Sequence, residues 1–245
     1  MTSRQLNIAT LWLYDSANDK LLTGGMERWC RDVARLVREH GYAVKIWQKS
    51  PAPFRKQLDD GIVIQGLPAS LSLAGNRELA RAIQRMGLTA EPWLFVSQEI
   101  LAFADFPRAV AVNHGVWWDG DFPWWKKTAN KLLQRRLILR AKATICVDTN
   151  YINWGHAELT GRSVWGPRLY YVPNYADTNA FMPAPALSVD ARQSPVLLFP
   201  RRVEGADLNS QGRGAGLFIR AVERLEAEGM RPRLLFAGRG KLQKE

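Results

Sequence analysis

The pattern strand, helix, strand between residues 196 and 240 limits what this chain can fold into. We expect a strand at residues 196–199, a helix at about residues 215–228 and a strand at residues 233–237. Together they form one βαβ unit, the opening of a Rossmann-like domain, and a single unit buries too little apolar surface to be stable alone. The sequence therefore predicts a complete first domain followed by the start of a second, so that the chain is the front part of a two-domain protein.

Upstream of this unit, short apolar segments alternate with amphipathic segments of helical length. Strands are expected at residues 6–13, 43–47, 61–65, 93–97, 109–112, 144–147 and 169–172, and helices at residues 26–40, 76–86, 126–141 and 150–158. This alternation favours a parallel sheet with helices on both faces. The predicted fold class is α/β, with a Rossmann-like domain at residues 1–174, a proline-containing linker at residues 175–195 and an incomplete domain at residues 196–245.

Positive charge is concentrated in the second half of the chain. Residues 121–245 carry 20 basic and 11 acidic side chains, a net of +9, whereas residues 1–120 carry 14 and 12, a net of +2. Seven cations and no acid fall between residues 126 and 142. A nucleic acid is not the expected partner, because no recognised binding motif accompanies the charge.

The expected helix at residues 126–141 reads as basic on one side and apolar on the other. Lys127, Lys131 and Arg135 share the basic side. The residues expected to face the core are Trp125, Ala129, Leu132, Leu133, Leu137 and Leu139. Such a helix is typical of a solvated face over a packed one, or of contact with an anionic membrane surface.

The sequence gives no sign of secretion or of a membrane span. Cys30 and Cys146 are too few for a disulfide framework and have no Cys or His at metal-binding spacing. The apolar run at residues 8–13 is not followed by a small-residue cleavage site, and no apolar stretch has spanning length. A reduced, cytoplasmic interior is the simplest setting.

A glycine pair before an expected helix and a histidine after an expected strand are candidates for ligand contact. Gly24 and Gly25 precede the helix at residues 26–40, where free N–H groups and the helix dipole favour an anion and glycine lets a phosphate approach the backbone. His114 follows the strand at residues 109–112, and ligands gather at the carboxyl ends of strands in open α/β sheets. A simple turn and a packed histidine are the alternative interpretations.

The segment at residues 117–125 holds four of the ten tryptophans. Indole rings such as those of Trp117 and Trp118 stack on sugars, anchor segments at membrane interfaces or pack in cores. Asp119-Gly120-Asp121 fits an Asp-x-Asp clamp for a divalent ion on a nucleotide diphosphate, although so short a match also arises by chance.

Arginines flank the start of the final βαβ unit. Arg201 and Arg202 follow the strand at residues 196–199, and Arg213 precedes the helix at residues 215–228. Guanidinium groups at a strand end and at a helix start can hold a diphosphate from two sides, whereas plain surface charge is the alternative.

These pieces, in this order, resemble the family 4 glycosyltransferases of GT-B architecture, in which two Rossmann-like domains face each other across a cleft. Four segments carry the resemblance: Gly24-Gly25-Met26-Glu27-Arg28 with Gly41-Tyr42-Ala43-Val44, Asn113-His114-Gly115, Val172-Pro173-Asn174-Tyr175-Ala176-Asp177, and Arg201-Arg202 through Arg213-Gly214. They are similar to the family's Gly-Gly-x-Glu opening, its acceptor-domain histidine segment, its Pro-Asn-Gly-Val-Asp stretch and its diphosphate-binding Gly-Arg to Lys-Gly region.

The resemblance implies a retaining, hexosyltransferase-type enzyme. It would move a sugar from a nucleotide diphosphate sugar to a glycan or lipid-linked acceptor in surface polysaccharide synthesis, with no obligatory cofactor or metal. The implied site consists of His114 as the catalytic residue, Gly24, Gly25, Arg202 and Arg213 at the donor diphosphate, and Trp117, Trp118 and Asp119 at the acceptor. Residues 1–174 would form the acceptor-side domain, and Lys127, Lys131 and Arg135 would contact a membrane where lipid-linked acceptors reside.

The sequence departs from the family pattern at several places. Arg213 stands where the family usually has Lys, Tyr175 where it usually has Gly, and Arg201 where it has Gly. The family's Glu-x7-Glu element, which holds the donor sugar and nucleotide, would lie beyond Glu245. We therefore expect this chain alone to be inactive.

Two other functions fit the same residues. Asp119 and Asp121 could serve a metal-dependent transferase, which a chelator would inactivate. A membrane- or nucleic-acid-binding module on a degenerate Rossmann domain is the non-enzymatic alternative, in which binding would depend on residues 126–142 and not on nucleotide.

Overall fold

The structure is a computed structural model. It describes residues 4–72, 74–115, 122–159, 168–176, 178–179, 182, 196–199 and 215–236. The chain divides into two compact units, Met1–Tyr175 and Ala176–Glu245, and each is described by itself.

An eight-stranded sheet forms the centre of the first unit. Its strands, in spatial order, are β10 (Leu169–Tyr171), β9 (Ala143–Cys146), β8 (Ala109–Asn113), β7 (Trp93–Phe95), β1 (Gln5–Ala9), β4 (Ala43–Ser50), β6 (Val63–Pro68) and β5 (Phe54–Gln57). Neighbouring strands run parallel, except that β5 pairs antiparallel with β6 at the edge. The predicted α/β class and mostly parallel sheet are confirmed.

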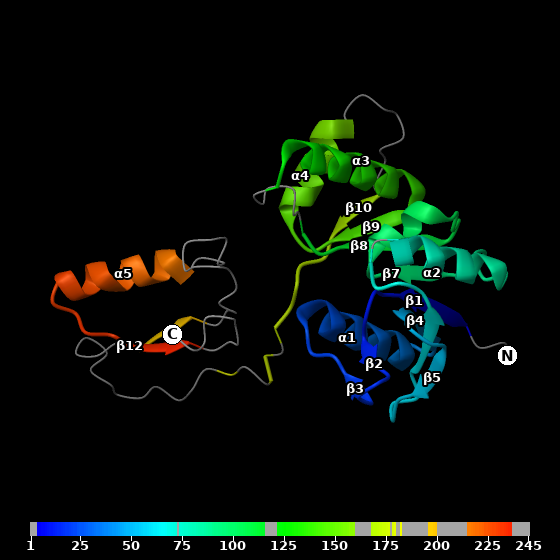
Figure 1. Cartoon of the computed structure of the whole chain (residues 1–245), viewed down its shortest axis with the longest axis horizontal. Coiled ribbons are helices and arrows are strands. Elements are labelled where there is room, and N and C mark those ends of the chain that lie inside the picture. The colour runs from blue at the N-terminus through cyan, green and yellow to red at the C-terminus, as the bar shows by residue number, and fades with distance from the viewer. Residues whose placement is uncertain are drawn as a thin grey trace. The chain divides into compact units, whose positions relative to one another are not determined.

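Helices cover both faces of this sheet. Figure 1 shows α1 (Gly25–Glu39) on one side, and α2 (Ala74–Arg85), α3 (Trp124–Arg140) and α4 (Thr149–Leu159) on the other. The strands supply apolar side chains to both layers: in β7, Leu94 packs in the core beneath α1, whereas Trp93 and Phe95 pack in the core beneath α2. Burial on both faces is the reason why these parallel strands read as continuous apolar runs.

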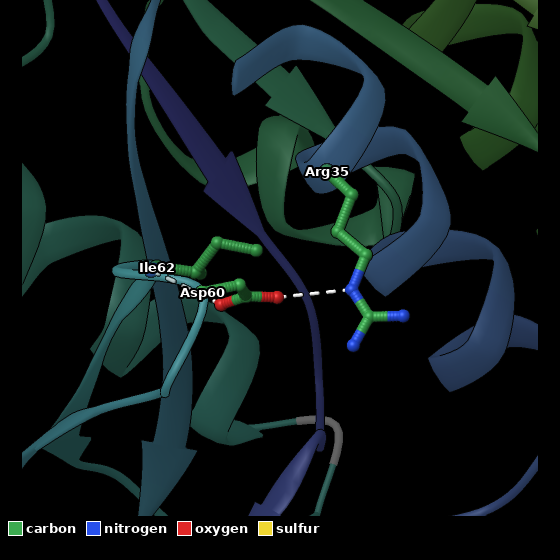
Figure 2. A network of polar contacts seen from close by, with 3 residues as sticks. All are labelled: Arg35, Asp60 and Ile62. Atoms are coloured by element: carbon green, nitrogen blue, oxygen red, sulfur yellow. Dashed lines mark hydrogen bonds and ion pairs between the residues drawn. The ribbon is translucent and has the colours of Figure 1, made fainter. Parts of the chain in front are cut away.

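Helix α1 is fixed to the sheet by its apolar side and by one ion pair. Trp29, Cys30 and Ala34 are its buried residues. Arg35 Nε donates to Asp60 Oδ2 at 2.9 Å, and the Ile62 N–H donates to Asp60 Oδ1 at 3.3 Å (Figure 2). Burial alone would raise the pKa of Asp60, but these two hydrogen bonds and nearby arginine charge outweigh it and hold the pKa below its usual value. The turn before β6 is thereby joined to the middle of α1.

Four small elements of the first unit were not expected from the sequence. Strands β2 (Tyr14–Asp15) and β3 (Lys20–Leu21) form a short hairpin between the first expected strand and the first expected helix. A 3-10 helix, η1 (Gln98–Phe103), follows β7, and β5 forms the sheet edge. Asn76, expected to open α2, lies inside the helix, where its Oδ1 accepts a hydrogen bond from the buried Lys49 ammonium at 3.0 Å.

The second unit contains the expected strand, helix and strand. β11 (Val196–Phe199) and β12 (Arg233–Phe236) pair in parallel, with α5 (Ala215–Ala227) between them in sequence. The rings of Phe199, Phe218 and Phe236 contact one another and join the helix to both strands. This is the βαβ unit that the sequence predicts.

The orientation of α3 differs from the helical-wheel prediction. Its buried residues are Asn130, Gln134, Leu137 and Ile138. Trp125, Ala129, Leu132 and Leu139, expected in the core, are exposed, with Leu132 at 60%. Lys127, Lys131 and Arg135, expected on a fully solvated side, are half-buried.

Candidate functional site

The candidate site is built at the carboxyl edge of the parallel sheet. The chain leaves β1 at this edge, and its loop is held against β4 because Gln48 Oε1 accepts hydrogen bonds from the N–H groups of Leu13 and Tyr14 at 3.0 and 2.9 Å. Ser97, just after β7, accepts from the Leu11 N–H at 3.0 Å and contacts Met26 Sδ at 3.9 Å. These contacts bring the start of α1 to the ends of β1 and β7.

The start of α1 has the features of an anion site. Gly24 is the N-cap residue and no side chain caps the helix, so its first N–H groups are not occupied by a capping oxygen. A side-chain carbon added at Gly25 would meet no atom within 4 Å, whereas one added at Gly24 would collide with the Glu27 carboxylate. Open space beside Gly25 leaves the backbone accessible to a ligand.

A cavity of about 580 Å³ adjoins this helix start and is lined by Gly24, Gly25 and one row of α1 side chains, Arg28, Arg31, Asp32 and Arg35. Arg35 is paired with Asp60. Asp32 lies 3.9 Å from the Arg28 Nε and accepts a hydrogen bond from the Tyr175 hydroxyl.

Arg31 is the arginine of this cavity for which the described residues provide no ion-pair partner. Its Nε is buried, and no described residue accepts a hydrogen bond from it. Together with the uncapped helix start, this guanidinium makes the cavity suited to an anion such as a phosphate. Sequence analysis missed these arginines, although their spacing at 28, 31 and 35 along an expected helix was a usable signal.

His114 follows β8 at the same edge of the sheet. Its ring meets the Trp29 ring of α1 edge-on, with 5.3 Å between centroids and 88° between planes. The side chain keeps access to solvent, but the surrounding protein lowers its pKa because burial disfavours the charged imidazolium. A neutral imidazole both donates and accepts hydrogen bonds, as a sugar hydroxyl requires.

The residues around His114 fix the turn that presents it. Gly115 has φ +121°, and its N–H donates to Asn113 Oδ1 at 2.9 Å. A side-chain carbon at Gly115 would lie 3.1 Å from Asp148 Oδ2. The structure thus brings His114 close to α1, the helix that begins at Gly24 and Gly25.

A buried lysine near this edge was also missed. Lys49, at 3% exposure, donates from Nζ to the carbonyls of Leu71 and Ser72 at 3.4 and 3.0 Å, and to Asn76. Burial lowers the pKa of Lys49 and raises the pKa of Glu99 in η1. The hydrogen bonds of Lys49 hold the loop before α2, so we assign it a structural role.

Several predicted site residues lie outside the described part of the chain. These are Trp117, Trp118, Asp119, Asp121, Arg201, Arg202 and Arg213. Their proposed roles at the acceptor, a metal ion and the donor diphosphate stay predictions.

The predicted membrane contacts lie on α3. Lys127, Lys131 and Arg135 flank its exposed apolar side chains, among them Trp124 at 78% exposure. No helix within the described residues is long and apolar enough to cross a membrane.

Comparison with known proteins identifies the fold. No family model and no curated protein matches the chain. Among solved structures, the sucrose-phosphate synthase of Thermosynechococcus elongatus matches with a TM-score of 0.59 and 11% identity, over 96% of this chain and 70% of that one. At this identity the likeness shows the fold, which is the Rossmann-like GT-B type. Membership of family 4 stays a prediction.

Proposed function

We propose that this chain belongs to a retaining glycosyltransferase that moves a sugar from a nucleotide diphosphate sugar to a glycan or lipid-linked acceptor in surface polysaccharide synthesis. The observation that carries the proposal is the uncapped start of α1 at Gly24 and Gly25, with the Arg31 guanidinium in the adjoining cavity and His114 packed against the same helix. The GT-B fold of the sucrose-phosphate synthase supports it.

In the proposed reaction, the bond between the anomeric carbon and the donor diphosphate breaks, and a bond to the acceptor oxygen forms on the same face. The leaving diphosphate oxygen takes the electron pair of the broken bond and accepts the proton that the acceptor hydroxyl loses. Helix N–H groups near Gly25 stabilise the developing negative charge, and Arg202 and Arg213, which lie outside the described residues, stay predicted contacts of the diphosphate. Preorganised charge of this kind is usually the largest catalytic contribution, so no obligatory metal or cofactor is proposed.

His114 orients the donor sugar or the acceptor in this proposal. Its lowered pKa supports the role, because a neutral ring at physiological pH can bond to a hydroxyl without holding a fixed charge. Trp117, Trp118 and Asp119 are proposed to hold the acceptor, since indole faces stack on sugar rings.

The exposed side of α3 supports a cytoplasmic enzyme that contacts the inner face of a membrane. Trp124, Trp125 and Leu132 are exposed, and the helix and its end carry seven cations without an acid between residues 126 and 142. Apolar anchors beside cations are the combination that binds an anionic bilayer surface. This observation also favours the second candidate function, a membrane-binding module without catalysis.

The test is an NMR titration of the isotope-labelled chain with uridine and guanosine diphosphate sugars at millimolar concentration. We expect shifts at the amides of Gly25 and Met26 and at the His114 ring, and weaker shifts after Arg31→Gln. The titration is repeated with a chelator, because the alternative of a metal-dependent transferase using Asp119 and Asp121 predicts that donor binding needs a divalent ion. Signals near Gly25 that stay unchanged at every donor concentration would refute the proposed donor site.

A further inference from the structure

A second cavity lies on the other side of the sheet from α1. It has a volume of about 380 Å³ and is lined mainly by Arg77 and Arg81 of α2, Arg136 and Arg140 of α3, and the apolar side chains of Phe103 and Leu133. Among the described residues, it shares no lining residue with the cavity beside Gly25. Because α2 and α3 cover the face opposite α1 (Figure 1), the proposed donor site does not account for it.

The four arginines of this cavity are not neutralised within the described part of the chain. None of the described residues that line the cavity is acidic, and none of the four arginines forms an ion pair with a described residue. The contrast is Arg35, which is neutralised by Asp60 at 2.9 Å. Like charges gathered around a partly enclosed space repel one another, and an anion in that space removes the repulsion.

Arg140 is held in place by the backbone. Its Nη1 donates to the Ala102 carbonyl at 2.8 Å and lies 3.5 and 3.4 Å from the carbonyls of Leu101 and Ala104. No described residue accepts from its Nε or Nη2. One guanidinium of the cluster is therefore positioned before any ligand arrives, which lowers the entropy cost of binding.

We propose that this cavity binds a compact, multiply charged phosphate group, such as a phosphomonoester or a pyrophosphate. Guanidinium groups match the geometry of phosphate oxygens and form charge-assisted, bidentate contacts. The volume is in the range of small-molecule sites. Phe103, at 42% exposure, and Leu133 provide an apolar wall for the uncharged part of the ligand. The inference does not depend on the proposed glycosyl transfer.

The first experiment is isothermal titration of the chain with inorganic pyrophosphate at low salt. The test variant is Arg81→Gln with Arg136→Gln, two exposed side chains whose loss leaves Arg140 in place. The matched control is Arg85→Gln with Lys126→Gln, which removes the same charge from the same two helices outside this cavity. The Arg31→Gln variant is measured in parallel, to distinguish pyrophosphate binding at the α1 cavity from binding at this one.

We expect the test variant to weaken pyrophosphate binding about tenfold or more, as for lost charge-assisted contacts, and the control to change it by about twofold at most. Equal weakening in both variants would mean general attraction to a basic surface, and would overturn the proposal. An unchanged affinity in the test variant would also overturn the proposal. So would a wild type that binds neither pyrophosphate nor the vesicles described next.

The second arm distinguishes a free phosphate compound from a lipid headgroup. Vesicles with phosphatidic acid, a phosphomonoester, are compared with phosphatidylglycerol vesicles of equal charge. The ligand is a lipid headgroup if the chain prefers the phosphatidic acid vesicles, if pyrophosphate displaces the chain from them, and if the test variant loses the preference. Pyrophosphate binding without that preference assigns a soluble ligand.

Discussion

Gly25 and Gly115 flank the candidate site, and the structure predicts opposite effects of alanine at the two positions. At Gly25 the added carbon meets nothing within 4 Å, and the backbone is not left-handed. Alanine there restricts the unfolded chain without straining the folded one, which stabilises by about 0.4–1 kcal/mol. For a protein of this size the melting temperature should rise by roughly 1–4 °C.

At Gly115 the same substitution should destabilise. The φ of +121° is one that residues with side chains rarely adopt, and holding such a residue there costs about 1–3 kcal/mol. The new carbon would also press on Asp148 Oδ2 at 3.1 Å, while Asp148 Oδ1 accepts the Tyr151 N–H at 3.1 Å at the start of α4. Gly115 is therefore required by the fold, whereas Gly25 is not.

The assay is urea unfolding followed by tryptophan fluorescence, which reports on the first unit because all ten tryptophans lie within it. Midpoints are compared at constant m-value. In the NMR titration, Gly25→Ala should reduce the donor-induced shifts in spite of its greater stability. A Gly25→Ala variant destabilised by more than about 1 kcal/mol would show that the glycine serves the fold, and the argument for a phosphate approaching this backbone would fail.

Four further predictions concern the site and its surroundings. If His114 positions the sugar, His114→Ala should reduce the turnover of sugar transfer by about 10²-fold with nucleotide affinity nearly intact; a variant that melts lower but keeps its turnover would identify a packing residue. Burial lowers the pKa of His114 in the folded state below its usual value of 6.5. The neutral His114 side chain therefore contributes stability above pH 6.5, and this contribution is lost as the pH falls through the folded-state pKa. The wild type should lose more stability on acidification than the His114→Asn variant. A double-mutant cycle of Arg35→Ala and Asp60→Ala should give a coupling of about 0.2–1 kcal/mol because both side chains are partly exposed, and a coupling of zero would contradict the tie in Figure 2. Leu132→Glu should weaken co-sedimentation with anionic vesicles at least as much as charge reversal of Lys127, Lys131 and Arg135; unchanged sedimentation in both variants would exclude membrane contact through α3.

The main sheet could be predicted because its strands are buried on both faces. Strands β7 and β8 carry apolar side chains at successive positions, and segments of helical length, α2 and α3, separate them in sequence from β6 and β9. The edge strand β5 gave no such signal. Its residues alternate between half-buried and exposed, and only its pairing with β6 defines it. The ion pair of Arg35 could not be predicted either, because its partner Asp60 is 25 residues away in sequence.

The orientation of α3 shows why a helical wheel was insufficient. The helix has apolar residues on every side, so hydrophobicity alone does not select the inward face. Hydrogen bonds across the interface do: Gln134 Oε1 accepts from Gln98 Nε2 at 2.8 Å and from the Tyr151 hydroxyl at 3.0 Å. Turning Gln134 outward would bury a leucine in its place, but it would also remove a shared acceptor from two buried donors, and the cost of leaving those donors without it opposes the gain from burial. Leu132 and Leu139 therefore face solvent beside the cations, and the case for membrane contact rests on these exposed apolar side chains as well as on charge.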